Sequence, residues 1–209
     1  MKRLRLAVLA SGRGSNLQAI LDGIKAGKVQ AEVVVVLSDK EQATALERAR
    51  RENIPAYWVN PADFAGKIQF EEGILEIIKE FNVDYIILAG FMRVFSPTFI
   101  RGAQVPILNI HPSLLPAFQG LHAQRQAVEY GVRYSGCTVH FLDEGVDTGP
   151  IIMQAVVPVY DGDTEESLAE RILKEEHRLY PAVIQLLAEG RITCQGRKVI
   201  IAGEEKDSE

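Results

Sequence analysis

The chain has 209 residues, of which 47% are hydrophobic and 24% charged, a composition typical of a globular protein with a sizeable core. Its formal net charge of -5 disfavours a general nucleic-acid-binding protein, whose phosphate contacts require an excess of Lys and Arg. The apolar residues near the start end at Ser11, too early for a signal peptide, and no run reaches the roughly 20 apolar residues that cross a bilayer. The two cysteines, Cys137 and Cys194, cannot form a disulfide framework or a zinc site alone, so we expect a cytoplasmic protein.

The first half of the chain alternates apolar, β-branched runs with longer helix-like stretches. We expect strands at residues 6–10, 33–37, 56–59, 84–88 and 106–110. Between them we expect a helix capped by Ser15 or Asn16, a second at residues 41–51 and a third at residues 68–81. The strand at residues 33–37 is apolar on both faces, as in a parallel sheet covered by helices on both sides. This order predicts a doubly wound, mostly parallel α/β sheet.

The character of the sequence changes after residue 113. A helix at residues 122–129 precedes two neighbouring strands, 137–141 and 151–156, which we expect to pair antiparallel. A long final helix at residues 164–187 opens with Thr164 and Ser167, and two glutamates in its first turn favour the helix dipole. Residues 192–194 and 198–201 predict a terminal hairpin, and residues 203–209 a frayed tail. No linker or repeat interrupts the chain, so we expect one domain over residues 1–209.

A glycine-containing loop at residues 11–16 joins the first strand to the first helix. Its glycines let backbone amides approach an anion, and the helix start adds a positive dipole end. A dinucleotide fingerprint requires a third glycine where Leu17 stands, although Asp39 lies about where a ribose-binding acid would be. The loop therefore predicts a monophosphate site, with a dinucleotide site and a structural turn as alternatives.

Asn109 and His111 lie two residues apart at the carboxyl end of a predicted strand, so their side chains share one face. Downstream, the turn at residues 143–150 carries three carboxylates, one of them Asp147. An amide donor, a histidine and a carboxylate can together perform acyl transfer, because the amide and a protonated histidine stabilise an oxyanion while the carboxylate raises the histidine pKa. Alternatively, His111 ends a strand and Asp147 belongs to an ordinary turn. The other histidines form no metal pattern and are expected to be structural or at the surface: His122, His140 and His177.

Five segments in order resemble the phosphoribosylglycinamide formyltransferases, which are folate-dependent enzymes of purine synthesis. The segments are residues 11–17 (SGRGSNL), 88–93 (LAGFMR), 109–116 (NIHPSLLP), 120–122 (GLH) and 143–150. The third is specific to folate-dependent formyl-transferring domains, and its combination with the first and fourth narrows the resemblance to the purine enzyme. The implied reaction moves a formyl group from 10-formyltetrahydrofolate to the amine of glycinamide ribonucleotide by direct attack, through a tetrahedral intermediate and without a metal.

The resemblance also implies roles for individual residues. The catalytic residues would be Asn109, His111 and Asp147, with Asp147 paired to His111. The ribonucleotide would be held by Gly14, Ser15, Asn16 and Glu176. The folate would contact Lys67, Met92, Arg93, Val94, Phe95, Asn109 and the loop residues Asp143, Glu144, Gly145, Val146 and Asp147. Residues 1–110 would form the phosphate-binding half and residues 111–202 the folate-binding and catalytic half.

Two positions depart from the family pattern. Leu173 stands where some relatives carry a phosphate-binding Lys, so the phosphate would rely on the loop, helped by Arg13 or Lys174. Gln119 replaces an expected proline, which changes the stiffness of the turn. Without the resemblance, we would expect the apolar residues at 91–95 to belong to the hydrophobic core.

Four other functions compete with this one. A methionyl-tRNA formyltransferase would need an RNA-binding domain and a basic face, and a formyltetrahydrofolate deformylase an N-terminal regulatory domain. An NAD(P)-dependent reductase would use the glycine loop with Asp39, and a non-catalytic nucleotide sensor would leave Asn109 and His111 unexplained. We expect small-molecule substrates, no nucleic-acid or membrane partner, and a monomer or weak homodimer.

Overall fold

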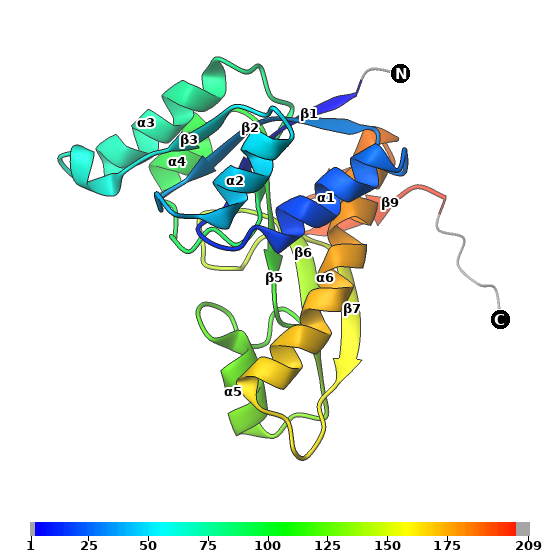
Figure 1. Cartoon of the computed structure of the whole chain (residues 1–209). Helices are drawn as coiled ribbons and strands as arrows, with labels where there is room; N and C mark the ends of the chain where they lie inside the picture. The colour runs from blue at the N-terminus through cyan, green and yellow to red at the C-terminus, as the bar shows by residue number, and fades with distance from the viewer. Residues whose placement is uncertain (1–2, 204–209) are drawn as a thin grey trace.

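The computed structural model describes residues 3–203 (Figure 1), so all but the first residue of the predicted frayed tail lies outside the described part. One seven-stranded sheet has the order β3-β2-β1-β4-β5-β6-β7. Its strands are β1 (Leu4–Leu9), β2 (Ala31–Ser38), β3 (Ala56–Trp58), β4 (Tyr85–Leu88), β5 (Ile107–His111), β6 (Tyr134–Phe141) and β7 (Ile151–Pro158). The first five run parallel, while β6 is antiparallel to both β5 and β7. The predicted fold class is confirmed, including the antiparallel additions.

Helices cover both faces of this sheet. They are α1 (Ser15–Lys25), α2 (Thr44–Arg51), α3 (Lys67–Lys79), α4 (Pro97–Gly102), α5 (Ala123–Tyr130) and α6 (Glu165–Ala188), with a short 3-10 turn η1 (Pro61–Asp63). Alternate residues of β1 enter two separate apolar layers: Leu6 and Val8 pack with α1, α2 and α6, while Ala7 and Leu9 pack with α3 and α4. In Figure 1, α3 and α4 lie on one side of the sheet and the long α6 on the other. The two-sided burial explains why the strands read as continuous apolar runs.

The predicted elements and the observed ones differ at a few places. Neither Ser15 nor Asn16 caps α1: the cap is Gly14, in the left-handed conformation at φ 66°, and no side chain bonds the first turn. The second helix begins at Thr44, three residues later than predicted, and α4 and η1 were not predicted. The capping box of α6 (Thr164 with Ser167) and the hairpin of β8 (Ile192–Gln195) and β9 (Lys198–Ile201) are confirmed.

The order of the strands determines where a ligand can bind. The chain runs from β1 outwards through β2 to β3 and then crosses to β4 on the other side of β1, so a crevice opens at the carboxyl ends of β1 and β4. The loops 10–14, 89–96 and 112–122 all start at this edge. From α6, the buried Tyr180 hydroxyl lies 3.0 Å from the Leu88 carbonyl and 3.1 Å from the Leu108 carbonyl, which fixes that helix against β4 and β5.

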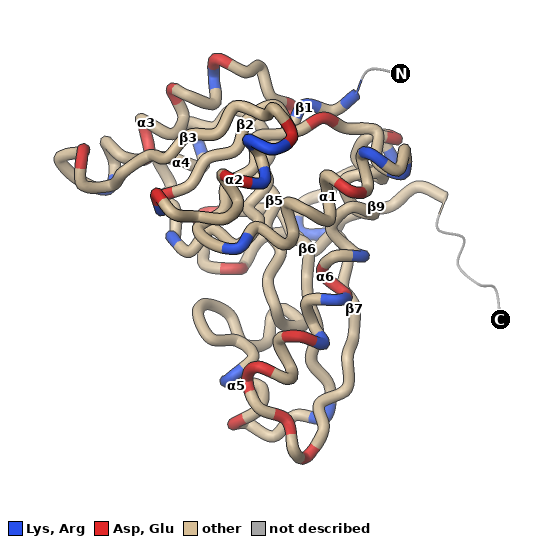
Figure 2. The backbone as a smooth tube through the Cα atoms, in the orientation of Figure 1, with Lys and Arg blue, Asp and Glu red and all other residues tan. Residues whose placement is uncertain are grey.

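Charged residues of both signs are interspersed along the backbone (Figure 2). Within residues 3–203, no helix combines the length and the apolar character needed to span a membrane.

Candidate functional site

A cavity of about 710 Å³ occupies the crevice at the carboxyl edge of the sheet. Its walls come from residues 12–16 and 88–95, from residues 109–112 and 120–124, from most of residues 140–148 and from one face of α6. This volume lies within the range of about 300 to 1,000 Å³ that is usual for small-molecule sites. The cavity therefore unites all of the segments that the sequence analysis singled out.

The loop before α1 forms one end of the cavity. Gly14 is required there, because a Cβ atom at this position would lie 2.7 Å from the Cβ of Ala45 and the backbone is left-handed. Since α1 has neither a side-chain cap nor an acidic residue in its first turn, its first amide N–H groups are available for an anion. Gly14, Ser15 and Asn16 all line the cavity.

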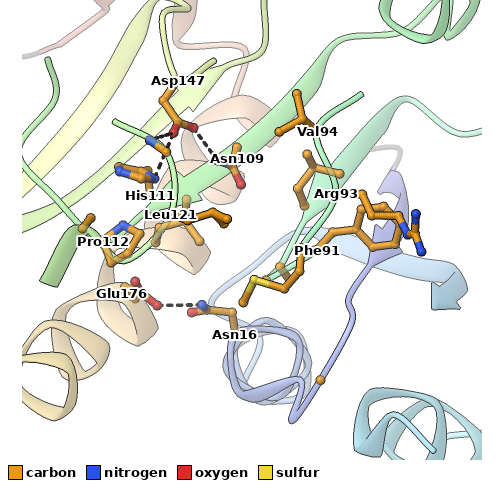
Figure 3. Close-up of a pocket in the computed structure, with 18 of the residues that line it drawn as sticks. Asn16, Phe91, Arg93, Val94, Asn109, His111, Pro112, Leu121, Asp147 and Glu176 are labelled. Carbon is orange, nitrogen blue, oxygen red and sulfur yellow. Dashed lines mark hydrogen bonds and ion pairs between the residues drawn. The ribbon is translucent and has the colours of Figure 1, made fainter. Parts of the chain in front are cut away.

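Asn16 connects this loop to α6. Its Nδ2 atom donates to Glu176 Oε2 at 2.8 Å, as Figure 3 shows, and both side chains are buried. The Oδ1 atom of Asn16 is buried and has no partner within the described residues. Burial raises the pKa of Glu176 above its ordinary value, although the Asn16 amide acts in the opposite direction. The pair presents acceptors that a hydroxyl-bearing ligand could satisfy.

Asn109, His111 and Asp147 converge in the middle of the cavity (Figure 3). His111 Nδ1 lies 3.3 Å from Asp147 Oδ2, and Asn109 Nδ2 lies 3.4 Å from Asp147 Oδ1. The Gly120 N–H donates to Asp147 Oδ2 at 2.9 Å, and His111 Nε2 lies 2.8 Å from the Phe118 carbonyl oxygen, to which it donates. The structure thus brings the three predicted catalytic residues together.

The environment shifts the pKa values of this pair. Burial lowers the pKa of His111 below its ordinary value and outweighs the Phe118 carbonyl and the Asp147 charge, which both raise it. For Asp147, burial raises the pKa, but the His140 contact, the His111 charge and the Gly120 N–H together bring it below the ordinary value. The charge of Asp147 therefore raises the pKa of His111, as predicted. Burial has the larger effect, so the pKa of His111 is lowered overall.

His140 is a member of this cluster that the sequence analysis placed among structural or surface histidines. Its Nε2 atom lies 3.3 Å from Asn109 Nδ2 and 3.6 Å from Asp147 Oδ1, and only 1% of the residue is exposed. Its Nδ1 atom donates to the Phe141 carbonyl at 2.9 Å; in the neutral imidazole this leaves Nε2 as an acceptor for Asn109, and in the protonated one Nε2 donates towards Asp147. His140 is placed there by the antiparallel register, in which Asn109 faces His140 across β5 and β6.

The segment at residues 91–95 forms the opposite wall. Met92 and Val94 are 70% and 57% exposed, which argues against an ordinary core segment. Phe95, by contrast, is buried and stacks on Phe99 of α4 at 3.8 Å between ring centroids. Arg93 donates to the buried Asp39 at 2.8 Å. Asp39 is not among the residues that line the cavity, so it is poorly placed as the ribose acceptor of a dinucleotide site.

The loop at residues 143–147 lines the cavity through four of its five residues: Asp143, Gly145, Val146 and Asp147. The exception is Glu144, which forms a 2.5 Å ion pair with Arg101 of α4. Lys67 also lies outside this cavity, in an adjoining hollow of about 180 Å³ that Arg93 and residues 94–95 border as well. Its Nζ atom lies 3.8 Å from Glu71 Oε1. In residues 3–203 no group of three or more His, Cys, Asp and Glu side chains is arranged to hold a metal ion.

Comparison with known proteins places the chain among close relatives. The formyl transferase family profile matches residues 4–184. A phosphoribosylglycinamide formyltransferase of Escherichia coli K12 is 42% identical over 96% of this chain and 95% of its own length. The crystal structure of glycinamide ribonucleotide transformylase 1 from Symbiobacterium toebii superposes with a TM-score of 0.93 at 52% identity, covering 96% of this chain and 94% of that one.

Longer proteins contain the same unit. The trifunctional purine biosynthetic protein adenosine-3 of Drosophila pseudoobscura is 48% identical over 91% of this chain, which spans 14% of the length of that protein.

Proposed function

The chain belongs to the formyl transferase family, and within it to the phosphoribosylglycinamide formyltransferases, and we propose that it transfers the formyl group of 10-formyltetrahydrofolate to the amine of glycinamide ribonucleotide. The products are the N-formyl ribonucleotide and tetrahydrofolate, and the reaction belongs to de novo purine biosynthesis. One observation carries the proposal: Asn109, His111 and Asp147 meet in the same cavity as the anion-accepting start of α1.

The ribonucleotide occupies the end of the cavity nearest α1. Gly14, Ser15 and Asn16 direct backbone N–H groups at its phosphate, where the helix dipole favours negative charge. Glu176 accepts hydrogen bonds from ribose hydroxyls, since its carboxylate lies beside Asn16 at the boundary between loop and α6. With the phosphate at α1 and the ribose beside Glu176, the glycinamide amine points towards Asn109 and His111.

The folate lies along residues 92–95 and the loop 143–147. Met92 and Val94 offer exposed apolar surface for a flat ring, while Arg93 is fixed by Asp39 and by the ring of Phe70, 5.2 Å from its guanidinium carbon. Exposed apolar side chains beside a polar backbone segment are typical of a site for a heteroaromatic ring. Glu144 and Lys67 flank the cavity without lining it, so we place them at its outer margin.

The chain itself supplies electrostatic stabilisation and proton transfer, because the formyl group reaches the site already activated on the folate nitrogen. Asn109 and protonated His111 stabilise the negative charge that develops on the formyl oxygen. The Asn109–Asp147 contact at 3.4 Å is long, so Asn109 can exchange it for the formyl oxygen. The charge of Asp147 favours the protonated form of His111 against the effect of burial, and Asp147 receives the amine proton, directly or through water. Neutral His140 accepts from Asn109 through Nε2 and so orients its amide.

Further parts of the proposal concern the setting of the enzyme. We assign residues 1–110 to phosphate binding and residues 111–202 to folate binding and catalysis within one domain, although Glu176 of the second part contacts the first. Both cysteines are free thiols, which fits a cytoplasmic protein. A monomer or weak homodimer without a required metal completes the proposal; sedimentation and chelator treatment test these two points.

The decisive assay mixes the purified protein with 10-formyl-dideazafolate and follows the absorbance of the deformylated product, with and without glycinamide ribonucleotide. Product that appears only with the ribonucleotide supports the transferase. Equal product without it points to a hydrolase, and no product in either mixture contradicts the proposal. The His111→Ala variant serves as the control for catalysis by a contaminant, since it lacks the proposed catalytic imidazole.

A further inference from the structure

Two arginines line the cavity, and they differ in whether a carboxylate neutralises them. Arg93 is paired with Asp39 at 2.8 Å. Arg13 is exposed and has no carboxylate within ion-pair distance among residues 3–203. An arginine that lines a substrate cavity without a protein anion is available for an anionic ligand.

The wall opposite Arg13 carries the wrong charge for a phosphate. The residues of α6 that line the cavity include four carboxylates and no cation: Glu165, Glu166, Glu170 and Glu176. Arg125 neutralises Glu165 at 2.8 Å, but the others have no cation within ion-pair distance in the described chain. A phosphate at the start of α1 would therefore face negative charge unless Arg13 contributes its own.

The local structure holds the backbone of Arg13 beside the start of α1, where its charge can act on a phosphate. Its backbone carbonyl accepts from Arg48 Nε at 2.9 Å, and the left-handed Gly14 follows, so the loop turns sharply at this point. Burial lowers the pKa of His177 on α6, and the charge of Arg13 lowers it further, so the positive charge of Arg13 acts on this part of α6. His177 Nε2 is itself buried without a partner among the described residues.

We propose that Arg13 is a phosphate ligand of the ribonucleotide, and that it supplies from the loop the charge that the α6 wall lacks at Leu173. The inference rests on the proposed function and names a further residue of the same site. Leu173 lines the cavity, whereas Lys174 is exposed and does not, so the geometry favours Arg13 over Lys174. A planar guanidinium can donate two parallel hydrogen bonds to a phosphate, which a lysine cannot.

The test compares binding of glycinamide ribonucleotide and of its phosphate-free riboside by isothermal titration calorimetry. In Arg13→Gln we expect the dissociation constant of the ribonucleotide to rise about 10- to 50-fold, the scale of one exposed charge-assisted contact, and that of the riboside to stay unchanged. Arg50→Gln, which removes the same charge from an exposed position of α2, is the matched control and should bind both ligands as the wild type does. Adding Leu173→Lys to Arg13→Gln should recover part of the lost ribonucleotide affinity.

Two results would overturn the inference: ribonucleotide affinity that is unchanged in Arg13→Gln, or an equal loss for the riboside, which would indicate a structural effect on the loop. Either would leave the proposed function intact if the wild type still transfers the formyl group. A wild-type protein that binds no ribonucleotide would contradict the proposed function and the role of Arg13 together. Turnover at saturating substrates in the Arg50→Gln control should match that of the wild type, because Arg50 lies on an exposed position of α2 and does not line the cavity.

Discussion

The contact between His111 and Asp147 gives the sharpest prediction about catalysis. Asp147→Asn removes the negative charge 3.3 Å from His111 Nδ1 but keeps an oxygen that can accept from the Gly120 N–H. At this distance the attraction between unit charges is about 5 kcal/mol at an effective dielectric constant of 20 and about 1 kcal/mol in bulk water. The two side chains are 6% and 13% exposed, so we take an intermediate value of about 3 kcal/mol for this attraction. We therefore expect turnover to fall about 100-fold, within the range for lost acid–base groups.

The pH dependence distinguishes this role from a structural one. If protonated His111 is the active form, turnover falls as the pH rises through the pKa of His111. Because the Asp147 charge raises that pKa, its removal lowers it, and the falling limb of the profile moves to lower pH. The assay is formyl transfer from 10-formyl-dideazafolate at saturating substrates across the pH range. Asp161→Asn, which removes an exposed carboxylate beside Arg133, should leave both turnover and profile as in the wild type.

A variant that keeps more than a tenth of wild-type turnover would refute the assigned role of Asp147. A profile that loses activity without moving would show that Asp147 acts on something other than the proton of His111. A limb that moves to higher pH would have the wrong sign for an attraction between the two groups.

Three further substitutions test the site and its support. Glu176→Gln should raise the Michaelis constant for the ribonucleotide about tenfold and leave that for folate unchanged, since the neutral amide accepts more weakly from ribose hydroxyls. Tyr180→Phe should lower the free energy of unfolding in urea by about 1 to 2 kcal/mol, because the buried hydroxyl that bridges carbonyls of β4 and β5 is lost. Gly149→Ala should prevent accumulation of folded protein, judged by circular dichroism, because the new Cβ would lie 1.8 Å from the Phe141 carbonyl oxygen.

The sequence predicted the elements that have strong periodicity and missed those that depend on tertiary contacts. The parallel strands and α6 are long apolar or amphipathic runs, so their positions follow from pattern alone. The six-residue α4 is too short to show a helical period, and its N-terminus depends on the Ser96 hydroxyl, which accepts from the Phe99 N–H. The cap of α1 was assigned to Ser15 or Asn16 because the left-handed Gly14 cannot be recognised from composition.

In the candidate site too, some residues were predictable from sequence pattern and others depend on tertiary packing. Asn109 and His111 are two residues apart on one strand, so their common face was predictable. His140 was not, because its position opposite Asn109 depends on the register of β5 and β6, which are separated by more than 20 residues. Lys67 begins α3 on the far side of Arg93, a placement set by the packing of that helix and not by its sequence neighbours.

The two interpretations of the segment around Asp147, an ordinary turn and a catalytic loop, do not exclude each other, because the turn is what directs the carboxylate into the cavity. Asp147 adopts the left-handed conformation at φ 52°, which is unfavourable for a residue with a side chain. Three contacts offset that cost: the Gly120 N–H on its carboxylate, His111 beside it, and Gln119, whose Nε2 donates to the Asp147 carbonyl at 3.1 Å. Gln119 therefore does more than replace an expected proline in a turn. Its side chain connects the segment after β5 to the backbone of Asp147. This contact fixes the loop that carries Asp147 relative to the segment that follows His111.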